Sequence, residues 1–287
     1  MPNSASVGHK RNVKLREKRG AFLCSLHFAC SALVTSSAHS RCHPLHCFPM
    51  PMSDAWKSRR QTLMIDADDT LWENNIYFER AIANFISFLN HRHFSAAEVR
   101  RKLNEVEHEN IVKLGYGLHS FAAALVGTFE RLSVEPLTPA LHEAIHGIAE
   151  AIAEQPIELL KHVGPTLDEL RSRHRMLLVT KGNVREQTGK VERSGLKPYF
   201  EAVEVVAEKN AESYNAIIEK YGLERRTTWM VGNSPKSDIN PAIAAGLNAV
   251  FIPHADTWIL EHAELCSAPE PQKLLTLERF GQLSEVF

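Results

Sequence analysis

LMIDADDTL, residues 63–71, places two aspartates one residue apart directly after a short apolar run. If the backbone stays extended, strand alternation puts Asp66 and Asp68 on the same side of the chain. Two carboxylates that close repel each other, so the pair needs a cation or a shared proton. A hard divalent cation suits carboxylate and carbonyl oxygens best. The stretch therefore predicts a buried strand that ends at an acidic site, with a solvated acidic turn as the alternative.

Three later segments follow the same design, an apolar run that ends in polar residues. They are residues 175–183 (RMLLVTKGN), 203–209 (VEVVAEK) and 228–239 (TWMVGNSPKSDI). Taken singly, each is an ordinary strand that meets a turn. All four segments in order, each at the carboxyl end of a predicted strand, indicate one shared site.

From residue 163 onward, predicted strands alternate with predicted helices. We expect helices near residues 166–174, 184–194, 211–221 and 238–245, and strands at residues 176–179, 203–207, 228–231 and 249–252. Gly195, Gly222 and Gly246 follow three of these helices as C-terminal caps. Such alternation predicts parallel strands with right-handed crossovers, and ligands bind such sheets at the carboxyl ends of the strands. The predicted fold class is α/β, a doubly wound parallel sheet.

The region between the first strand and residue 163 has helical patterning only. Apolar residues recur at helical spacing at Phe78, Ile82, Phe85, Ile86 and Leu89. Ser95 with Glu98 forms a capping box, and Thr138-Pro139 opens a further helix. The predicted organisation is an N-terminal extension at residues 1–58, an α/β core built from residues 59–75 and 161–287, and an inserted α-helical cap at residues 76–160.

These four motifs resemble those of the haloacid-dehalogenase-like (HAD) hydrolase superfamily, whose core is Rossmann-like. The resemblance covers roughly residues 60–255 and matches members with a cap inserted after the first motif. It implies that Asp66 is a nucleophile, that Asp68 is a general acid/base, and that Thr180 binds the transferring phosphoryl group. It also implies that Lys209 offsets negative charge on the nucleophile and phosphate. Lys181 and Lys190 are rivals for that role, but Lys209 follows a strand, where the family places this lysine.

The resemblance also implies a metal site and a substrate-binding turn. The metal ligands would be Asp66, Asp238 and the backbone carbonyl of Asp68, with Mg²⁺ as the cofactor. Asn233 departs from the family pattern, because Gly232 is often followed by aspartate there; its amide oxygen can still coordinate a hard cation, but without charge. The substrate-binding residues would be Thr180, Lys181, Gly182 and Asn183.

The function implied is that of a magnesium-dependent phosphatase that forms an aspartyl phosphate on a small phosphorylated substrate. Asp68 would be protonated when the substrate arrives, which a neighbouring carboxylate favours. A haloacid dehalogenase shares the fold and nucleophile, but the second aspartate is typically absent in that branch. A phosphotransferase or sugar-phosphate mutase would keep every residue named, and a non-catalytic binding module would be expected to have lost the nucleophile or the lysine.

Composition sets the broader class. The 287 residues carry a formal net charge of -1, with 44% hydrophobic and 23% charged residues, which is typical of a globular enzyme and gives no basic footprint for nucleic acid. No apolar run reaches the length of a membrane span. We therefore expect a cytoplasmic enzyme without nucleic-acid or membrane partners; the oligomeric state is open.

The first 51 residues differ in composition from the rest. They hold seven basic residues, one acid and four of the five cysteines. A segment outside the working protein, with Met52 as a natural start, is the favoured interpretation, and we expect it to be largely disordered. A targeting segment and a metal cluster at residues 42–47 are the alternatives.

Overall fold

The computed structural model describes residue 57 and residues 59–90 and 93–287. The expectations for residues 1–51 lie outside the described residues. The described chain forms a six-stranded sheet with the order β3-β2-β1-β4-β5-β6, in which every pair of neighbours is parallel. The strands are β1 (Thr62–Ile65), β2 (Arg175–Lys181), β3 (Ala202–Val206), β4 (Thr228–Gly232), β5 (Asn248–Phe251) and β6 (Leu274–Thr276). The predicted doubly wound parallel sheet is confirmed.

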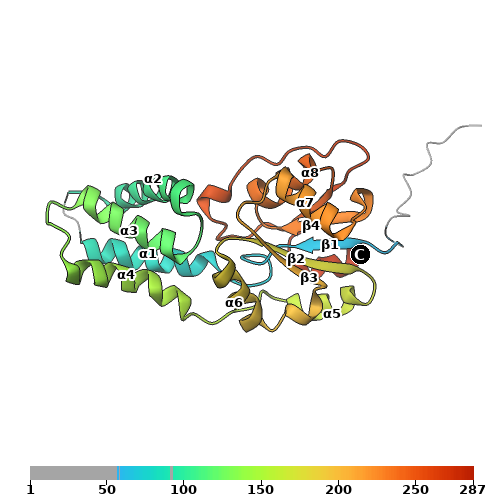
Figure 1. Ribbon diagram of the computed structural model, residues 1–287, viewed down its shortest axis with the longest axis horizontal. Helices are drawn as coiled ribbons and strands as arrows, with labels where there is room; N and C mark the ends of the chain where they lie inside the picture. Colours follow the sequence, from blue (N-terminus) through green and yellow to red (C-terminus); the bar gives the residue numbers. More distant parts are fainter. Residues whose placement is uncertain (1–56, 58, 91–92) are drawn as a thin grey trace, which may run out of the picture. The chain divides into compact units, whose positions relative to one another are not determined.

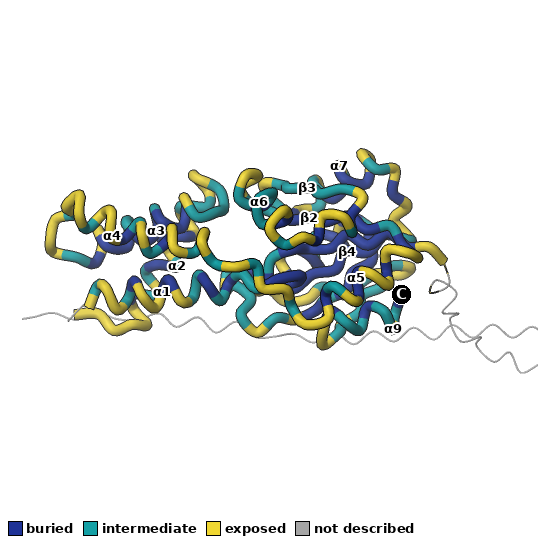
Figure 2. The backbone as a smooth tube through the Cα atoms, turned by 90° about the horizontal axis from the view of Figure 1, so that it is seen from below, coloured by how far each residue is buried: buried dark blue, intermediate teal, exposed yellow. Residues whose placement is uncertain are grey.

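Helices cover both faces of this sheet. Figure 1 shows α5 (Val163–Arg171) and α6 (Val184–Ser194) on one face, and α7 (Ala211–Tyr221) and α8 (Asn240–Ala244) on the other. Side chains along β1 point alternately to the two faces of the sheet: Leu63 and Ile65 pack with α5, whereas Met64 packs with α7 and α8. Figure 2 shows the central strands as the buried part of the backbone. The sheet is therefore a rigid platform whose carboxyl edge can hold reactive groups in place.

Several elements differ from the sequence-based expectation. The helix expected at residues 166–174 runs three residues earlier, over Val163–Arg171. The helix expected at residues 238–245 is a π-turn, Pro235–Ile239, followed by the short α8. The strand β6 was not predicted; it is three residues long and only partly buried, so it lacks a buried apolar run. The remaining short elements are 3-10 turns at Lys197–Tyr199, Arg225–Thr227, Ile259–Glu261 and Phe280–Gln282, and α9 (Leu283–Val286).

Four helices lie in sequence between β1 and β2, and we call them the helical insert: α1 (Asn75–Leu89), α2 (Ala96–Leu114), α3 (Leu118–Leu132) and α4 (Pro139–Ala153). They have a hydrophobic core of their own, which includes Phe85, Leu103, Leu125 and Ile145. The capping box of Ser95 and Glu98 is present at the start of α2. Among the described residues, no helix is both long and apolar enough to cross a membrane.

Two short linkers join the helical insert to the sheet, and they pair with each other. The Glu73 N–H donates to the Glu158 carbonyl at 2.9 Å, and the Leu160 N–H donates to the Leu71 carbonyl at 2.9 Å. Trp72 and Leu159 form an antiparallel bridge between these two bonds. The outgoing and returning chain are thus tied together beside the end of β1, close to the acidic motif.

His174 connects the start of β1 to the last residue of the chain. Its Nδ1 accepts the Gln61 N–H at 3.1 Å, and its Nε2 lies 2.9 Å from the Phe287 carbonyl oxygen. These contacts require a neutral ring with the proton on Nε2. Burial lowers the pKa of His174 below its ordinary value of 6.5, although the Phe287 carbonyl partly opposes this.

A group with a lowered pKa in the folded state binds its proton more readily in the unfolded chain. The stability contributed by neutral His174 is therefore full above the unfolded pKa and is lost as the pH falls through the folded pKa. We predict that the free energy of unfolding falls more steeply from about pH 7 to about pH 5 in the wild type than in His174→Gln. Urea titrations at each pH measure the free energy of unfolding. His108→Gln, at an exposed position, should keep the wild-type slope; equal slopes in all three proteins would contradict the assignment.

Candidate active site

A cavity opens at the carboxyl ends of β1, β2 and β4. Its empty volume is about 1080 Å³, part of it open to solvent. The sheet contributes the acidic motif, Thr180 and Lys209, and the helical insert contributes side chains from α1, α2 and α3. Parallel strands bring their carboxyl ends to one edge, which is why motifs far apart in sequence meet here.

Lys209 is the centre of the site. Its ammonium donates to Asp66 and, at 2.7 Å, to Asp238 Oδ1. All three residues are almost fully buried, with exposed fractions of 4% for Lys209, 6% for Asp66 and 1% for Asp238. Gly232 permits this arrangement, because a Cβ there would overlap the Asp238 carboxylate.

The charges of this trio control one another. Burial and the neighbouring Asp238 raise the pKa of Asp66, and the attraction of Lys209 only partly offsets them. Burial acts to lower the pKa of Lys209, but Asp238 and Asp66 outweigh it and hold the pKa above its ordinary range. Lys209 therefore stays charged. Its single positive charge compensates only one of the two buried carboxylates that contact it.

Asp68 has a separate set of partners. Lys190 Nζ lies 2.8 and 2.9 Å from its two oxygens, Gln187 Nε2 donates at 2.9 Å, and Trp72 Nε1 donates at 2.8 Å. Burial acts to raise the pKa of Asp68, but the attraction of Lys190 and these hydrogen bonds outweigh it and lower the pKa. In the free protein the Lys190 ammonium and these hydrogen bonds favour the carboxylate form of Asp68; its protonation when substrate arrives stays a prediction.

Oxygen atoms from β1 and β4 converge beside Asp66. Thr70 Oγ1 lies 3.0 Å from Asp66 Oδ2 and 3.3 Å from Asn233 Oδ1. Asn233 donates its amide hydrogen away from the site, to Thr257 Oγ1 at 3.0 Å, so its oxygen faces the carboxylates. Asp66, Asp238 and Asn233 are thus a set of hard oxygen donors that fits a cation such as Mg²⁺. The side chain of Asp68 is engaged by Lys190, Gln187 and Trp72 instead.

The turn after β2 was expected to bind substrate. Thr180, Lys181 and Gly182 line the cavity, whereas Asn183 is exposed and does not. The Asn183 side chain instead caps α6, accepting the backbone N–H groups of Arg185 and Glu186 at 3.0 and 3.2 Å.

Within the described chain, Lys181 forms its hydrogen bonds and ion pairs with residues other than Asp66 and Asp68. Its ammonium donates to Glu261 at 2.6 Å, to Ser237 at 2.7 Å and to Glu208 at 3.3 Å. Of the three lysines considered from the sequence, Lys209 contacts Asp66 and Lys190 contacts Asp68. Lys181 therefore belongs to a neighbouring charge network.

The loop between α2 and α3 meets the core beside this network. Tyr116 Oη donates to Glu208 at 2.7 Å, and its ring lies under the Lys181 ammonium at 4.3 Å. Gly117 has φ of 119°, and a Cβ there would approach a Glu186 carboxylate oxygen to 2.8 Å. The same carboxylate accepts the Leu118 N–H at 3.1 Å. Tyr116, Gly117 and Glu186 all line the cavity, so these contacts join the helical insert to the core at its wall.

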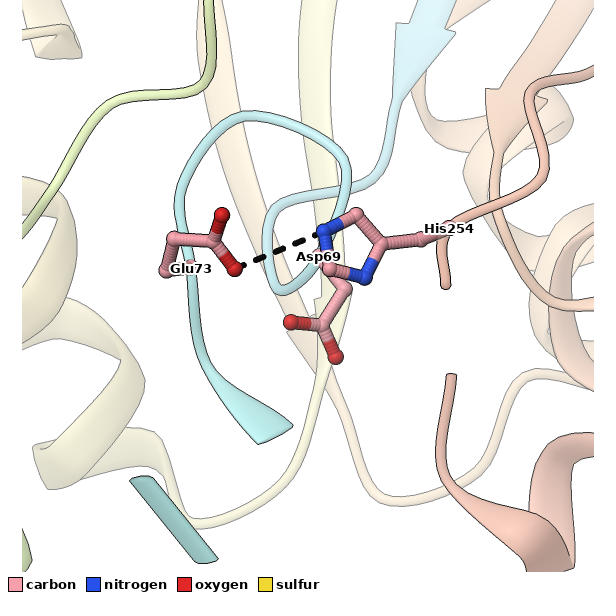
Figure 3. Close-up of side chains that lie close together, drawn as sticks. All are labelled: Asp69, Glu73 and His254. Carbon is pink, nitrogen blue, oxygen red and sulfur yellow. Dashed lines mark ion pairs between the residues drawn. The ribbon is translucent and has the colours of Figure 1, made fainter. Parts of the chain in front are cut away.

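A second titratable cluster, Asp69, Glu73 and His254, lies at the linker to α1 (Figure 3). Its ligand atoms lie within 4.8 Å of one another. Asp69 Oδ1 already accepts the Asn74 and Asn75 N–H groups at 2.8 and 3.0 Å. His254 Nδ1 accepts the Asp256 N–H at 3.3 Å, so its proton is on Nε2, which faces Glu73 at 3.4 Å. The cluster is satisfied by the protein itself and ties the linker to the core.

The sequence alone did not reveal three features of this site: the partners of Asp68, the Lys181 network and which residues of the helical insert line the cavity. Gln187 and Lys190 are three residues apart and so share one face of α6, and a helix that starts at the cavity mouth points that face inward. That spacing is the one sequence signal that could have indicated the partners of Asp68. Glu261 and Glu107 lie in segments whose direction depends on tertiary packing, so no local pattern marks them.

Fold and site together define a hydrolase of the α/β type with an aspartate at the end of its first strand. Residues 61–246, more than half of the chain, match the family model described as haloacid dehalogenase-like hydrolase. The chain belongs to this family. The predicted superfamily is confirmed.

Two curated relatives match part of the chain. Human N-acylneuraminate-9-phosphatase is 31% identical over 129 residues, which is 42% of this chain and 50% of that protein. Pyrimidine 5'-nucleotidase YjjG of Escherichia coli (strain K12) is 31% identical over 140 residues, which is 46% of this chain and 56% of that protein. The chain thus spans about half the length of the curated relatives it matches.

Solved structures match over a longer stretch. A haloacid dehalogenase-like family hydrolase from Xanthomonas campestris is 25% identical with a TM-score of 0.67, covering 79% of this chain and 94% of that one. The magnesium-bound HAD-hydrolase YfnB from Bacillus subtilis is 16% identical with a TM-score of 0.55, covering 79% and 98%. The second likeness concerns the fold alone.

Lys209→Met tests the charge balance of the site. Removing the cation leaves two buried carboxylates without compensation, so we predict a loss of about 3–5 kcal/mol in the free energy of unfolding, measured by urea titration in chelator. Lys220→Met, which removes an exposed lysine paired with Glu204, should change it by less than about 1 kcal/mol. Asp66→Asn in the Lys209→Met background should recover part of the loss; equal, small losses in both single variants would contradict this account.

Proposed function

We propose that this protein is a magnesium-dependent phosphomonoester hydrolase that acts through an aspartyl phosphate on a small phosphorylated metabolite. The observation that supports it most is the buried ammonium of Lys209 held against both Asp66 and Asp238. Such an arrangement suits a dianionic phosphoryl group, because the charge it brings needs fixed cations at close range. Both named relatives are phosphatases, of an acylneuraminate and of pyrimidine nucleotides.

In the proposed reaction, Asp66 attacks phosphorus in line, and the bond from phosphorus to the leaving oxygen breaks. Thr180 and Lys209 hold the non-bridging oxygens, where the transition state keeps its charge. Mg²⁺, held by Asp66, Asp238, Asn233 and the Asp68 carbonyl, would supply the positive charge that lets two anions approach. Lys181 and Gly182 border the phosphoryl position, and Asn183 contributes by capping α6.

The proton steps fall to Asp68. In the first half-reaction, Asp68 would take up a proton from solvent as the dianionic substrate binds and would donate it to the leaving oxygen. In the second half-reaction, the ionised Asp68 would take a proton from the water that hydrolyses the aspartyl phosphate. Lys190, 2.8 Å from Asp68, would hold this carboxyl in position. The presence of Asp68 and its three donors favours phosphate chemistry over dehalogenation, which requires no such group.

Asp66→Asn is predicted to lower turnover of phosphomonoesters by at least about a thousandfold, because it removes the nucleophile and a metal ligand together. Asp168→Asn, at an exposed pair with Arg171, should stay within about twofold of wild type. Excess chelator should abolish wild-type activity, and added Mg²⁺ should restore it. Release of inorganic phosphate measures each case, and unfolding curves confirm that both variants fold. Persistent activity in Asp66→Asn or in chelator would refute the proposal.

A further inference from the structure

The cavity continues from the carboxylates into the helical insert. Asn75, Phe78 and Ile82 of α1 all line it. Their spacing of three and four residues places them on one face of the helix, over a length of roughly 10 Å. A phosphoryl group is much shorter than that, so the part of the cavity within the helical insert has room for a leaving group.

This part of the cavity is mainly apolar. Its lining includes Phe78 and Ile82 from α1, Ile111 from α2 and Phe121 from α3. The rings of Phe78 and Phe121 meet edge to face, with centroids 5.0 Å apart. Such walls gain free energy by covering an apolar or aromatic surface, and they offer nothing to a strongly hydrated one.

Glu107 of α2 is the one acid that the helical insert contributes to this lining, which also includes the polar Asn75 and Ser120. Its exposed fraction is 7%, and its Oε2 is buried without a hydrogen-bond partner among the described residues. Leaving a buried carboxylate oxygen unpaired costs free energy, so such a group in a cavity wall calls for a functional explanation, such as a bound ligand that donates to it. Glu107 lies one helical turn before Ile111 and lines the same cavity.

The nearby arginine does not satisfy Glu107. Arg100 donates to both oxygens of Glu79, at 2.5 and 2.7 Å, and to Asn104 Oδ1 at 2.9 Å. Burial raises the pKa of Glu107 to about 7; the attraction of Arg100 opposes this and the repulsion of Glu79 adds to it. Arg100 is balanced by Glu79, so above its pKa Glu107 gives this part of the cavity an uncompensated negative charge.

We infer that Glu107 determines specificity at a leaving-group subsite in this part of the cavity. The subsite takes an uncharged or cationic group with an apolar face, and Glu107 accepts a hydrogen bond from an N–H or O–H of that group. This inference rests on the proposed phosphatase function. The substrate class is a phosphomonoester of an alcohol that carries a donor away from the phosphate, such as a nucleoside with an amino-bearing base. Leaving groups that carry a carboxylate are disfavoured, because Glu107 repels them in a low-dielectric cavity.

Three phosphomonoesters on one scaffold test the subsite: benzyl phosphate, para-(aminomethyl)benzyl phosphate and para-carboxybenzyl phosphate. We expect wild-type kcat/KM to rank the amine first and the carboxylate last. Glu107→Leu should lower the value for the amine by about tenfold or more, because the acceptor is lost. Glu107→Gln should raise the value for the carboxylate by about tenfold, because the repelling charge is lost. Benzyl phosphate should change by no more than about twofold in either variant.

A second readout separates a subsite from a structural role. Removing an unpaired buried carboxyl should raise the thermal midpoint of the free protein in both Glu107 variants or leave it unchanged. Glu105→Gln, on the same helix at an exposed position paired with Lys102, is the matched control and should leave the substrate ranking as it is. A lower midpoint with equal losses on all three substrates would show that Glu107 is structural and would overturn the inference.

The two proposals fail in different ways. If wild type hydrolyses benzyl phosphate but the ranking of the three substrates is the same in Glu107→Leu, the subsite is wrong and the phosphatase function stands. If wild type hydrolyses none of the three, nor any other phosphomonoester with Mg²⁺ present, the proposed function is wrong and the subsite fails with it.

Discussion

The contact of one buried ammonium with two buried carboxylates is the constraint on which the rest of the structure depends. Lys209 follows β3, Asp66 follows β1 and Asp238 follows β4, so the three meet only if parallel strands end at the same edge. Gly232 is required because the Asp238 carboxylate occupies the space of a Cβ. The paired linkers at Glu73 and Glu158 then let a whole helical insert leave and rejoin the sheet without disturbing that edge.

Charge is separated into three networks around the cavity. Lys209 forms ion pairs with Asp66 and Asp238, and Lys190 forms one with Asp68. Lys181 forms ion pairs with Glu261 and Glu208. Each network keeps one lysine beside its own acids, and all three lysines line the cavity. The helical insert contributes apolar walls and a single acid instead. The two halves of the cavity therefore differ in chemistry: the half at the sheet is lined by paired charges, and the half within the helical insert is mainly apolar.

Local signals predicted much of this fold. The apolar run of β1, the capping box of Ser95, and Gly195 and Gly222 with φ of 70° and 58° each determine their own element, so periodicity and turn chemistry located them. The partly buried β6 and the π-turn before α8 depend on packing and were missed. Within the site, Thr180 lies near the end of β2, and Asp66, Lys209 and Asp238 follow strands, so the sequence could place them at the cavity. The ion pair of Asp68 and Lys190 joins residues 122 apart in sequence, which no local pattern encodes.

The central claim is that Asp66 is the nucleophile that becomes phosphorylated. The most direct measurement is a rapid acid quench during turnover of a phosphomonoester that carries a labelled phosphoryl group, followed by peptide mapping. The account predicts transient label on the peptide that contains residues 63–71, localised to Asp66, in an amount that decays as substrate is consumed. Turnover without label on this peptide, or label on another residue, would contradict it.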